Sequence, residues 1–236
     1  MTDAELDRIR AAYTERDAAT DTPYRWGNPA NVAFIQQVER ALLCSFADAG
    51  VTLAGMRVLD VGCGTGYYLH RLREYGAGEC HGIDLMENRV AAGRERYPPL
   101  HLRVGNAADL PFADGEFDLV TQFTCLSSIL DPSVRLAAAR EMQRVARGGS
   151  VLSFDMRGIL PARFRRTRPG ETPTVVALDE QELERLFGAP VLLRRVALAF
   201  ELAQLTGGRT ILTGALGAFP PLRSHLLGIW RIAPTH

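Results

Sequence analysis

Short runs of apolar and β-branched residues alternate with longer amphipathic stretches between residues 56 and 155. The runs at 56–61, 79–84, 100–105, 117–122 and 150–155 predict strands, and the stretches at 66–75, 87–97 and 133–146 predict helices. This alternation is typical of an α/β fold with a mostly parallel sheet. Right-handed crossovers then place the helices on both faces.

Further elements flank this central block. Residues 3–18 predict one helix, and a second begins at Asn28 and Pro29, with apolar side chains at helical spacing through Phe46. Asp131 and Asp179 are typical N-cap residues of later helices. The runs at 191–199 and 226–232 predict two more strands, which brings the sheet to seven. We interpret residues 1–50 as a helical lid and residues 51–236 as one ligand-binding domain, in which residues 157–222 cover the substrate.

The charges exclude several kinds of chemistry. The chain has 27 basic and 27 acidic residues, and every basic residue is arginine. Schiff-base catalysis by an internal lysine, including that of pyridoxal phosphate enzymes, and a P-loop lysine are therefore excluded. A net charge near zero argues against nucleic acid as a partner.

The remaining composition suggests where the protein resides. Cys44, Cys63, Cys80 and Cys125 form no C-x-x-C pair, which favours reduced thiols over a disulfide framework or a metal site. The acidic N-terminus is unlike a signal peptide, and no apolar stretch reaches the ~20 residues of a membrane span. We expect a cytoplasmic protein without bound metal or stable membrane insertion.

Three alternating glycines, Gly62, Gly64 and Gly66, lie where the first strand of the central block meets a helix. Bare backbone at this position lets a ligand approach closely. A dinucleotide site needs its third glycine one residue later, where this chain has Tyr67. The carboxylate of Asp60 would repel a pyrophosphate and suits a cationic ligand such as S-adenosylmethionine.

With these motifs in this order, residues 56–155 resemble the class I S-adenosylmethionine-dependent methyltransferases, especially those that act on small molecules. The glycine loop is similar to the family's first motif, and the run His81-Gly82-Ile83-Asp84-Leu85 is similar to its second. The resemblance implies a Rossmann-like fold and S-adenosylmethionine as the cofactor. It implies that Asp84 holds the ribose hydroxyls, with Leu85 beside it, although an acid at this distance from the loop also fits NAD.

The resemblance also implies roles for residues after the later strands. Asn106 stands where the family usually has aspartate, and the backbone N–H of Ala107 would read the adenine. Gln122 would lie beside the methionine part of the cofactor. Tyr24 and Trp26, like Tyr13, lie where such enzymes often close a lid, although these aromatics also suit plain packing of the helices on the sheet.

The acceptor site is less well defined. Asp155 at the end of the fifth strand and His225 at the start of the seventh are candidate catalytic bases, each with a structural role as its alternative. Five arginines between residues 157 and 168 suit either a solvated loop or an anionic acceptor. The apolar segment 200–222 suits a cover over the acceptor, a homodimer contact or a shallow membrane-surface anchor.

We therefore predict methyl transfer from S-adenosylmethionine to a small molecule, at an oxygen, in specialised (natural product) or glycan metabolism. Methylation at nitrogen or carbon, a non-catalytic protein that binds the cofactor, and an NAD-dependent oxidoreductase are the alternatives.

Overall fold

The structure, a computed structural model, describes residues 3–18, 27–158, 174–198 and 215–234. Within these residues one seven-stranded sheet has the order β3-β2-β1-β4-β5-β7-β6. Its strands are β1 (Val58–Val61), β2 (Cys80–Asp84), β3 (His101–Val104), β4 (Leu119–Phe123), β5 (Ser150–Met156), β6 (Leu192–Leu198) and β7 (Arg223–Arg231). β7 runs antiparallel to both of its neighbours, and the other pairs are parallel. The predicted Rossmann-like, mostly parallel sheet is confirmed.

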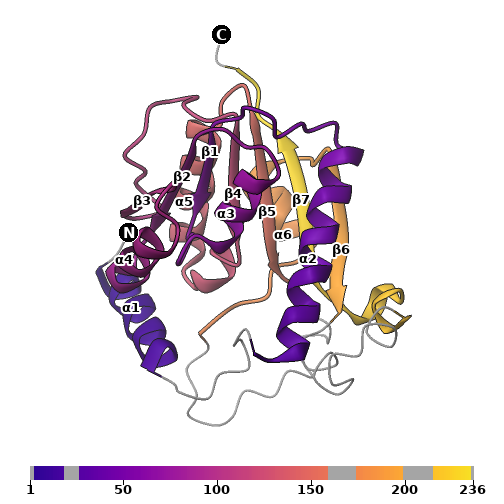
Figure 1. Ribbon diagram of the computed structural model, residues 1–236, viewed down its shortest axis with the longest axis horizontal. Helices are drawn as coiled ribbons and strands as arrows, with labels where there is room; N and C mark the ends of the chain where they lie inside the picture. The colour runs from indigo at the N-terminus through magenta and orange to yellow at the C-terminus, as the bar shows by residue number, and fades with distance from the viewer. Residues whose placement is uncertain (1–2, 19–26, 159–173, 199–214, 235–236) are drawn as a thin grey trace.

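Helices cover both faces of the sheet (Figure 1). α2 (Pro29–Asp48), α3 (Tyr67–Glu74) and α4 (Glu87–Arg96) lie on one face, and α5 (Pro132–Val145) and α6 (Glu180–Phe187) lie on the other. The predicted N-caps are confirmed, because Asn28, Asp131 and Asp179 each accept a hydrogen bond from a backbone N–H in the first turn of their helix.

α2 belongs to the core of the domain. Its Val38, Leu42 and Phe46 are buried in the same hydrophobic cluster as residues of β1, β5 and β7. The Tyr67 hydroxyl of α3 also donates a 2.6 Å hydrogen bond to Glu39 of α2. The apolar stripe of α2 is therefore covered by the sheet, and the helical lid over residues 1–50 stays a prediction.

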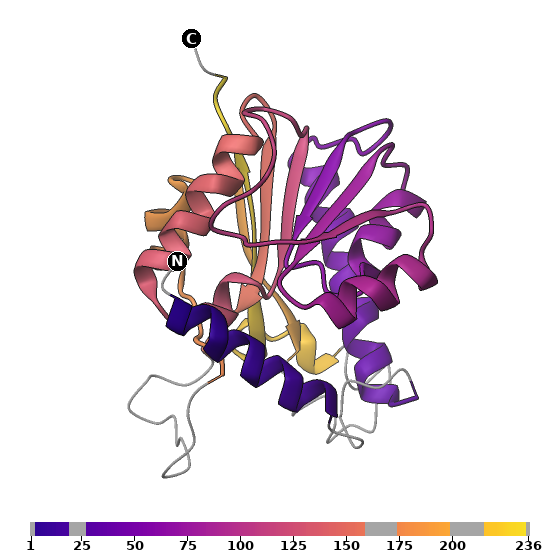
Figure 2. The same ribbon diagram turned by 90° about the vertical axis from the view of Figure 1, so that its left-hand side faces the viewer.

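α1 (Asp3–Ala18) has a different position, across the carboxyl ends of the parallel strands (Figure 2). It is held there mainly by polar contacts. Glu5 accepts a hydrogen bond from the Leu130 N–H, at 2.7 Å, and Arg8 donates to the Ser128 carbonyl, at 2.6 Å. At its other end, Asp17 forms an ion pair with Arg89 of α4. α1 is therefore an attached element above the strand ends.

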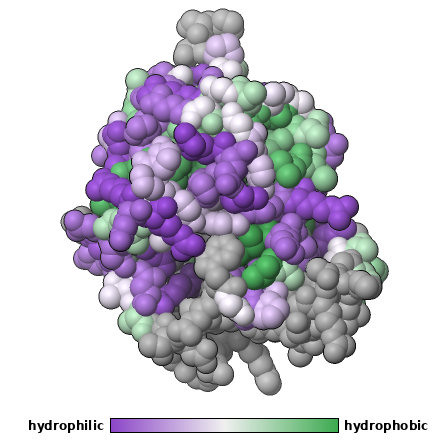
Figure 3. Space-filling model, viewed as in Figure 1, coloured by the Kyte–Doolittle hydropathy of each residue, from purple (hydrophilic) through white to green (hydrophobic). Residues whose placement is uncertain are grey.

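The face formed by α2, α3 and α4 is largely hydrophilic, with hydrophobic residues gathered toward α2 and β6 (Figure 3). Leu43 of α2 and Val191, which precedes β6, are among the exposed large hydrophobic residues. Homodimer formation stays a prediction. Among the described helices, none has the length and apolar character that crossing a membrane requires.

Candidate functional site

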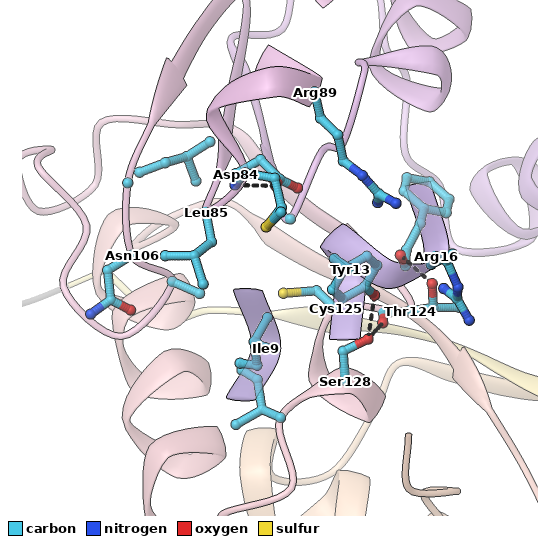
Figure 4. A pocket seen from close by; sticks show the side chains of 17 residues that line it. Ile9, Tyr13, Arg16, Asp84, Leu85, Arg89, Asn106, Thr124, Cys125 and Ser128 are labelled. Atoms are coloured by element: carbon cyan, nitrogen blue, oxygen red, sulfur yellow. Dashed lines mark hydrogen bonds between the residues drawn. The ribbon is translucent and has the colours of Figure 1, made fainter. Parts of the chain in front are cut away.

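A cavity of about 180 Å³ lies between α1 and the carboxyl ends of β1 to β4 (Figure 4). This is the edge at which open α/β sheets bind ligands. The sheet side of the wall comes from the segments that follow these four strands, and the opposite side comes from α1 and α4. The lining residues are Gly62, Ile83, Asp84, Leu85, Met86, Gly105, Asn106, Ala107, Phe123, Thr124, Cys125, Ser128 and Ile129, with Ile9, Tyr13 and Arg16 of α1 and Arg89 of α4.

The three glycines of the loop have three different roles. Gly62 lines the cavity at φ +74°, and a Cβ added to it would lie 2.7 Å from the Cβ and Sγ of Cys125. Gly64 does not line the cavity, and its N–H donates a 2.7 Å hydrogen bond to Asp84 Oδ2. Gly66 is also outside the lining, and an added Cβ would lie 3.0 Å from Leu100 Cδ1. Of the three predicted ligand contacts, the geometry supports only Gly62 directly.

Asp84 faces the cavity with its carboxylate already oriented. Oδ2 accepts from the Gly64 N–H and Oδ1 accepts from the Met86 N–H, at 2.7 and 2.9 Å. Burial raises the pKa of this carboxyl, and the two backbone N–H groups oppose that rise. Asp84 is thus a fixed acceptor, ready for further donors such as the hydroxyls of a ribose.

Leu85, Asn106 and Ala107, the predicted cofactor residues after β2 and β3, line the cavity. The Asn106 side-chain carbonyl accepts a 2.9 Å hydrogen bond from the Ala108 N–H, which shapes the turn after β3. With Ile9 of α1 opposite the sheet, Leu85 and Ala107 give this end of the cavity apolar walls.

Asp60 lies behind the glycine loop and does not line the cavity. It is 2% exposed and accepts a 2.8 Å hydrogen bond from the Thr121 hydroxyl. Burial raises its pKa to about 8. Its strand position turns Asp60 into the protein interior, and its role beside the ligand stays a prediction.

Gln122 and Asp155 are fully buried and do not line the cavity. Gln122 Nε2 donates a 2.6 Å hydrogen bond to Asp155 Oδ2, and Asp155 Oδ1 accepts from the Ser127 N–H at 3.0 Å. Burial raises the Asp155 pKa to about 6. The expectation that Asp155 faces an acceptor, and that Gln122 contacts the cofactor, is not met by the described residues; both side chains face the segment after β4 instead.

His225 lies on the opposite face of the sheet from Asp155. It pairs with Met156 across β5 and β7, so its ring packs against Phe154, at 4.7 Å between centroids, and against Phe34 of α2, at 5.1 Å. Burial lowers its pKa to about 4. His225 does not line the cavity and packs against these two rings, and its role as a base stays a prediction.

Sequence reasoning missed much of the far wall. Ile9, Tyr13 and Arg16 lie three or four residues apart, the spacing of one helix face, and this stripe was the available signal. Tyr13 donates or accepts a 2.7 Å hydrogen bond with Ser128 Oγ, and Arg89 lies 4.4 Å from the centroid of its ring. Tyr24, Trp26 and residues 159–168 of the predicted arginine segment lie outside the described residues, as does most of segment 200–222. In the described part of the chain, no group of three or more His, Cys, Asp or Glu residues could hold a metal ion.

Comparisons with known proteins show which proteins this chain is similar to. Residues 58–149 match the family described as "Methyltransferase domain". The chain is 38% identical over 110 residues to demethylmenaquinone methyltransferase of Staphylococcus aureus, which covers 44% of each protein. It is 35% identical over 115 residues to ajmaline N-methyltransferase of Rauvolfia serpentina, covering 44% of this chain and 38% of that protein. In each, the match spans less than half of the relative's length.

The fold extends beyond this matched region. The crystal structure of the PH0226 protein from Pyrococcus horikoshii superposes with a TM-score of 0.63 and 17% identity, and covers 90% of this chain and 96% of that one. The sheet order and the glycine loop with Asp84 after β2 accompany this match, so that residues 58–149 resemble a methyltransferase domain.

Proposed function

We propose that this protein transfers the methyl group of S-adenosylmethionine to a small-molecule acceptor. The observation that carries the proposal is the cavity wall in which Gly62, Asp84, Leu85 and Ala107 come together from three consecutive strand ends. These residues belong to the segment that matches the methyltransferase family.

The residues present fit the cofactor. Asp84 offers fixed carboxylate oxygens for the ribose hydroxyls, and Leu85 and Ala107 offer apolar surfaces for the adenine. Gly62 presents bare backbone to the cavity, and a larger residue at this position would collide with Cys125. The cofactor supplies a methyl group activated by its sulfonium.

The chain's own task is then to align the acceptor and to exclude water. Alignment matters because the reacting atoms must lie about 3–3.5 Å apart. Thr124, Cys125 and Ser128 form the wall at the end of β4, and α1 closes the opposite side. Ligand pockets commonly measure roughly 300–1,000 Å³; the cavity is smaller, at about 180 Å³, and α1 forms one of its walls.

For the acceptor we retain an oxygen nucleophile, in a more restricted form. Asp155 and His225 do not line the cavity, so neither is placed to take a hydroxyl proton. We therefore propose an oxygen that is already ionised, and the guanidinium groups of Arg16 and Arg89 at the cavity support such an anionic acceptor. A nitrogen acceptor is the second candidate, because one similar protein is ajmaline N-methyltransferase.

A methyl-transfer assay tests the proposal. The purified chain is incubated with S-adenosylmethionine carrying a labelled methyl group and with pooled metabolites, in separate anionic and amine fractions. We expect labelled product in the anionic fraction. Product in the amine fraction alone would replace the oxygen acceptor by nitrogen. Cofactor binding without any product, over all fractions, would favour the non-catalytic alternative.

A further inference from the structure

The segment after β4 turns sharply beside the cavity. We call residues 124–128, which include η1 (Leu126–Ser128), the β4 corner. Thr124 has φ +59°, a left-handed conformation that costs a non-glycine residue roughly 1–2 kcal/mol. Its N–H donates a 2.7 Å hydrogen bond to the Phe154 carbonyl, so the strained residue is tied to β5. Such a conformation persists only where its surroundings hold it.

Gln122 makes several of the hydrogen bonds that stabilise this conformation of the β4 corner. Its Oε1 accepts hydrogen bonds from the Cys125 N–H at 2.8 Å and from the Leu126 N–H at 3.3 Å. Its Nε2 donates to Asp155 Oδ2 and to Ser153 Oγ, both at 2.6 Å. The side-chain amide therefore links the corner to β5 with both of its ends.

Asp155, on the neighbouring strand β5, also stabilises the β4 corner. Oδ2 accepts from Gln122 and Oδ1 accepts from the Ser127 N–H, so the carboxyl orients the amide and also binds the corner directly. Burial of a carboxyl is costly unless hydrogen bonds compensate it. Here the compensating donors are amide groups of Gln122 and of the corner itself.

The corner has two outward sides. Thr124 and Cys125 line the cavity next to Gly62. Ser128 receives α1: its Oγ donates to the Thr124 carbonyl at 3.0 Å, which leaves Oγ to accept from the Tyr13 hydroxyl at 2.7 Å. Figure 4 shows Tyr13 and Ser128 directed toward each other. The β4 corner thus forms part of the cavity wall through Thr124, Cys125 and Ser128, and it contacts α1 through Ser128.

We infer that Gln122 and Asp155 are positioning residues that hold the β4 corner in place. This buried pair thereby positions both the wall of the methyl-transfer site and the corner residue that α1 contacts. The inference rests on the proposed function for the statement that this wall faces the transferred methyl group. It replaces the direct catalytic role expected of Asp155 by one exerted through the corner.

Asp155→Asn and the exchanged pair Gln122→Glu/Asp155→Asn test this inference. The single variant lacks one acceptor, so either the Ser127 N–H or the Gln122 amide loses its partner. In the exchanged pair, the new amide at position 155 donates to the new carboxylate at position 122, and that carboxylate still accepts from the corner. We expect kcat to fall roughly 10- to 100-fold in the single variant, since a misplacement of about 1 Å has this effect. The dissociation constant for S-adenosylhomocysteine should stay within about 3-fold, and the exchange should restore most of kcat. A catalytic base would not be restored by the exchange.

A thiol-labelling experiment reports on the corner without using activity. In a Cys44→Ser background, which removes the exposed thiol, the rate at which a maleimide modifies Cys125 is measured by peptide mass spectrometry. Asp155→Asn should raise this rate, and the exchanged pair should return it to the original value. Ser153→Ala is the matched control, because it removes a partner of Gln122 but no acceptor of the corner. Should Asp155→Asn not fold, Gln122→Met is measured in the same way.

Unchanged Cys125 labelling in Asp155→Asn would overturn the inference. So would failure of the exchanged pair to restore the labelling rate, if its unfolding free energy equals that of the original protein. Failure of the unaltered chain to bind S-adenosylhomocysteine would instead overturn the proposed function, and the labelling results would still decide whether Asp155 holds the corner.

Discussion

Replacing Gly62 by alanine tests how closely the glycine loop approaches the β4 corner. The new Cβ would lie 2.7 Å from both Cβ and Sγ of Cys125, well inside van der Waals contact. Rotation of the Cys125 side chain moves Sγ but leaves Cβ in place, so the backbone of the loop or of the corner must shift. Gly62 also has φ +74°, where an L-residue is strained.

The expected loss of unfolding free energy follows from the strained backbone conformation and the close contact. The left-handed conformation costs alanine roughly 1–2 kcal/mol, and overpacking of a close contact costs about 1–3 kcal/mol. Gly64→Ala is the matched control, because Gly64 has φ +55° and an added Cβ would meet no atom within 4 Å. Both substitutions restrict the unfolded chain similarly. Gly62→Ala should therefore lose about 1–3 kcal/mol more unfolding free energy than Gly64→Ala.

Urea denaturation at pH 7, followed by circular dichroism, measures both free energies. Calorimetric titration with S-adenosylhomocysteine on the same samples should show the larger loss of affinity for Gly62→Ala, since only Gly62 lines the cavity. Equal losses of stability and of affinity in the two variants would refute the close approach between Gly62 and Cys125.

Two further substitutions address the carboxylate and the histidine. Asp84→Asn should weaken S-adenosylhomocysteine binding roughly 10- to 100-fold, because a hydrogen bond to a charged group contributes about 1.5–3 kcal/mol; calorimetry measures this, and unchanged affinity would remove Asp84 from the ribose site. His225 has a folded-state pKa of about 4, below its ordinary 6.5, so the unfolded chain binds the proton more tightly and stability falls as the pH drops from 6.5 toward 4. Between pH 8 and pH 5 this group removes about 2 kcal/mol of unfolding free energy. In His225→Phe that part of the acid sensitivity should disappear from urea denaturation curves, and an identical pH dependence in both proteins would contradict the burial of a neutral imidazole.

The cavity wall on the sheet side was largely predictable because it follows directly from strand ends. Gly62, Asp84 and Asn106 each lie at or just after the end of a parallel strand, and parallel strands deliver their carboxyl ends to one edge. Nothing more than the order of strands and helices is needed for that placement. The glycine pattern predicted the cavity wall less well. Gly64 binds Asp84 within the loop and Gly66 packs closely against Leu100, and neither lines the cavity.

The acceptor side depended on facts that no local pattern contains. Successive residues of a strand point to opposite faces, so the register of β7 against β5 decides where His225 and Asp155 point. With His225 opposite Met156, the two predicted bases lie on different faces of the sheet. α1 illustrates a second limit: its contacts with Ser128 and Leu130 join residues more than a hundred positions apart, and its polar sequence contains only a short stripe to indicate a buried side.

We expect the cavity below α1 to bind S-adenosylmethionine. Parallel calorimetric titrations of the unaltered chain with S-adenosylmethionine, S-adenosylhomocysteine and NAD are the decisive test. We expect saturable one-to-one binding of both sulfur nucleotides and no measurable binding of NAD. Tight binding of NAD without binding of the sulfur nucleotides would contradict it.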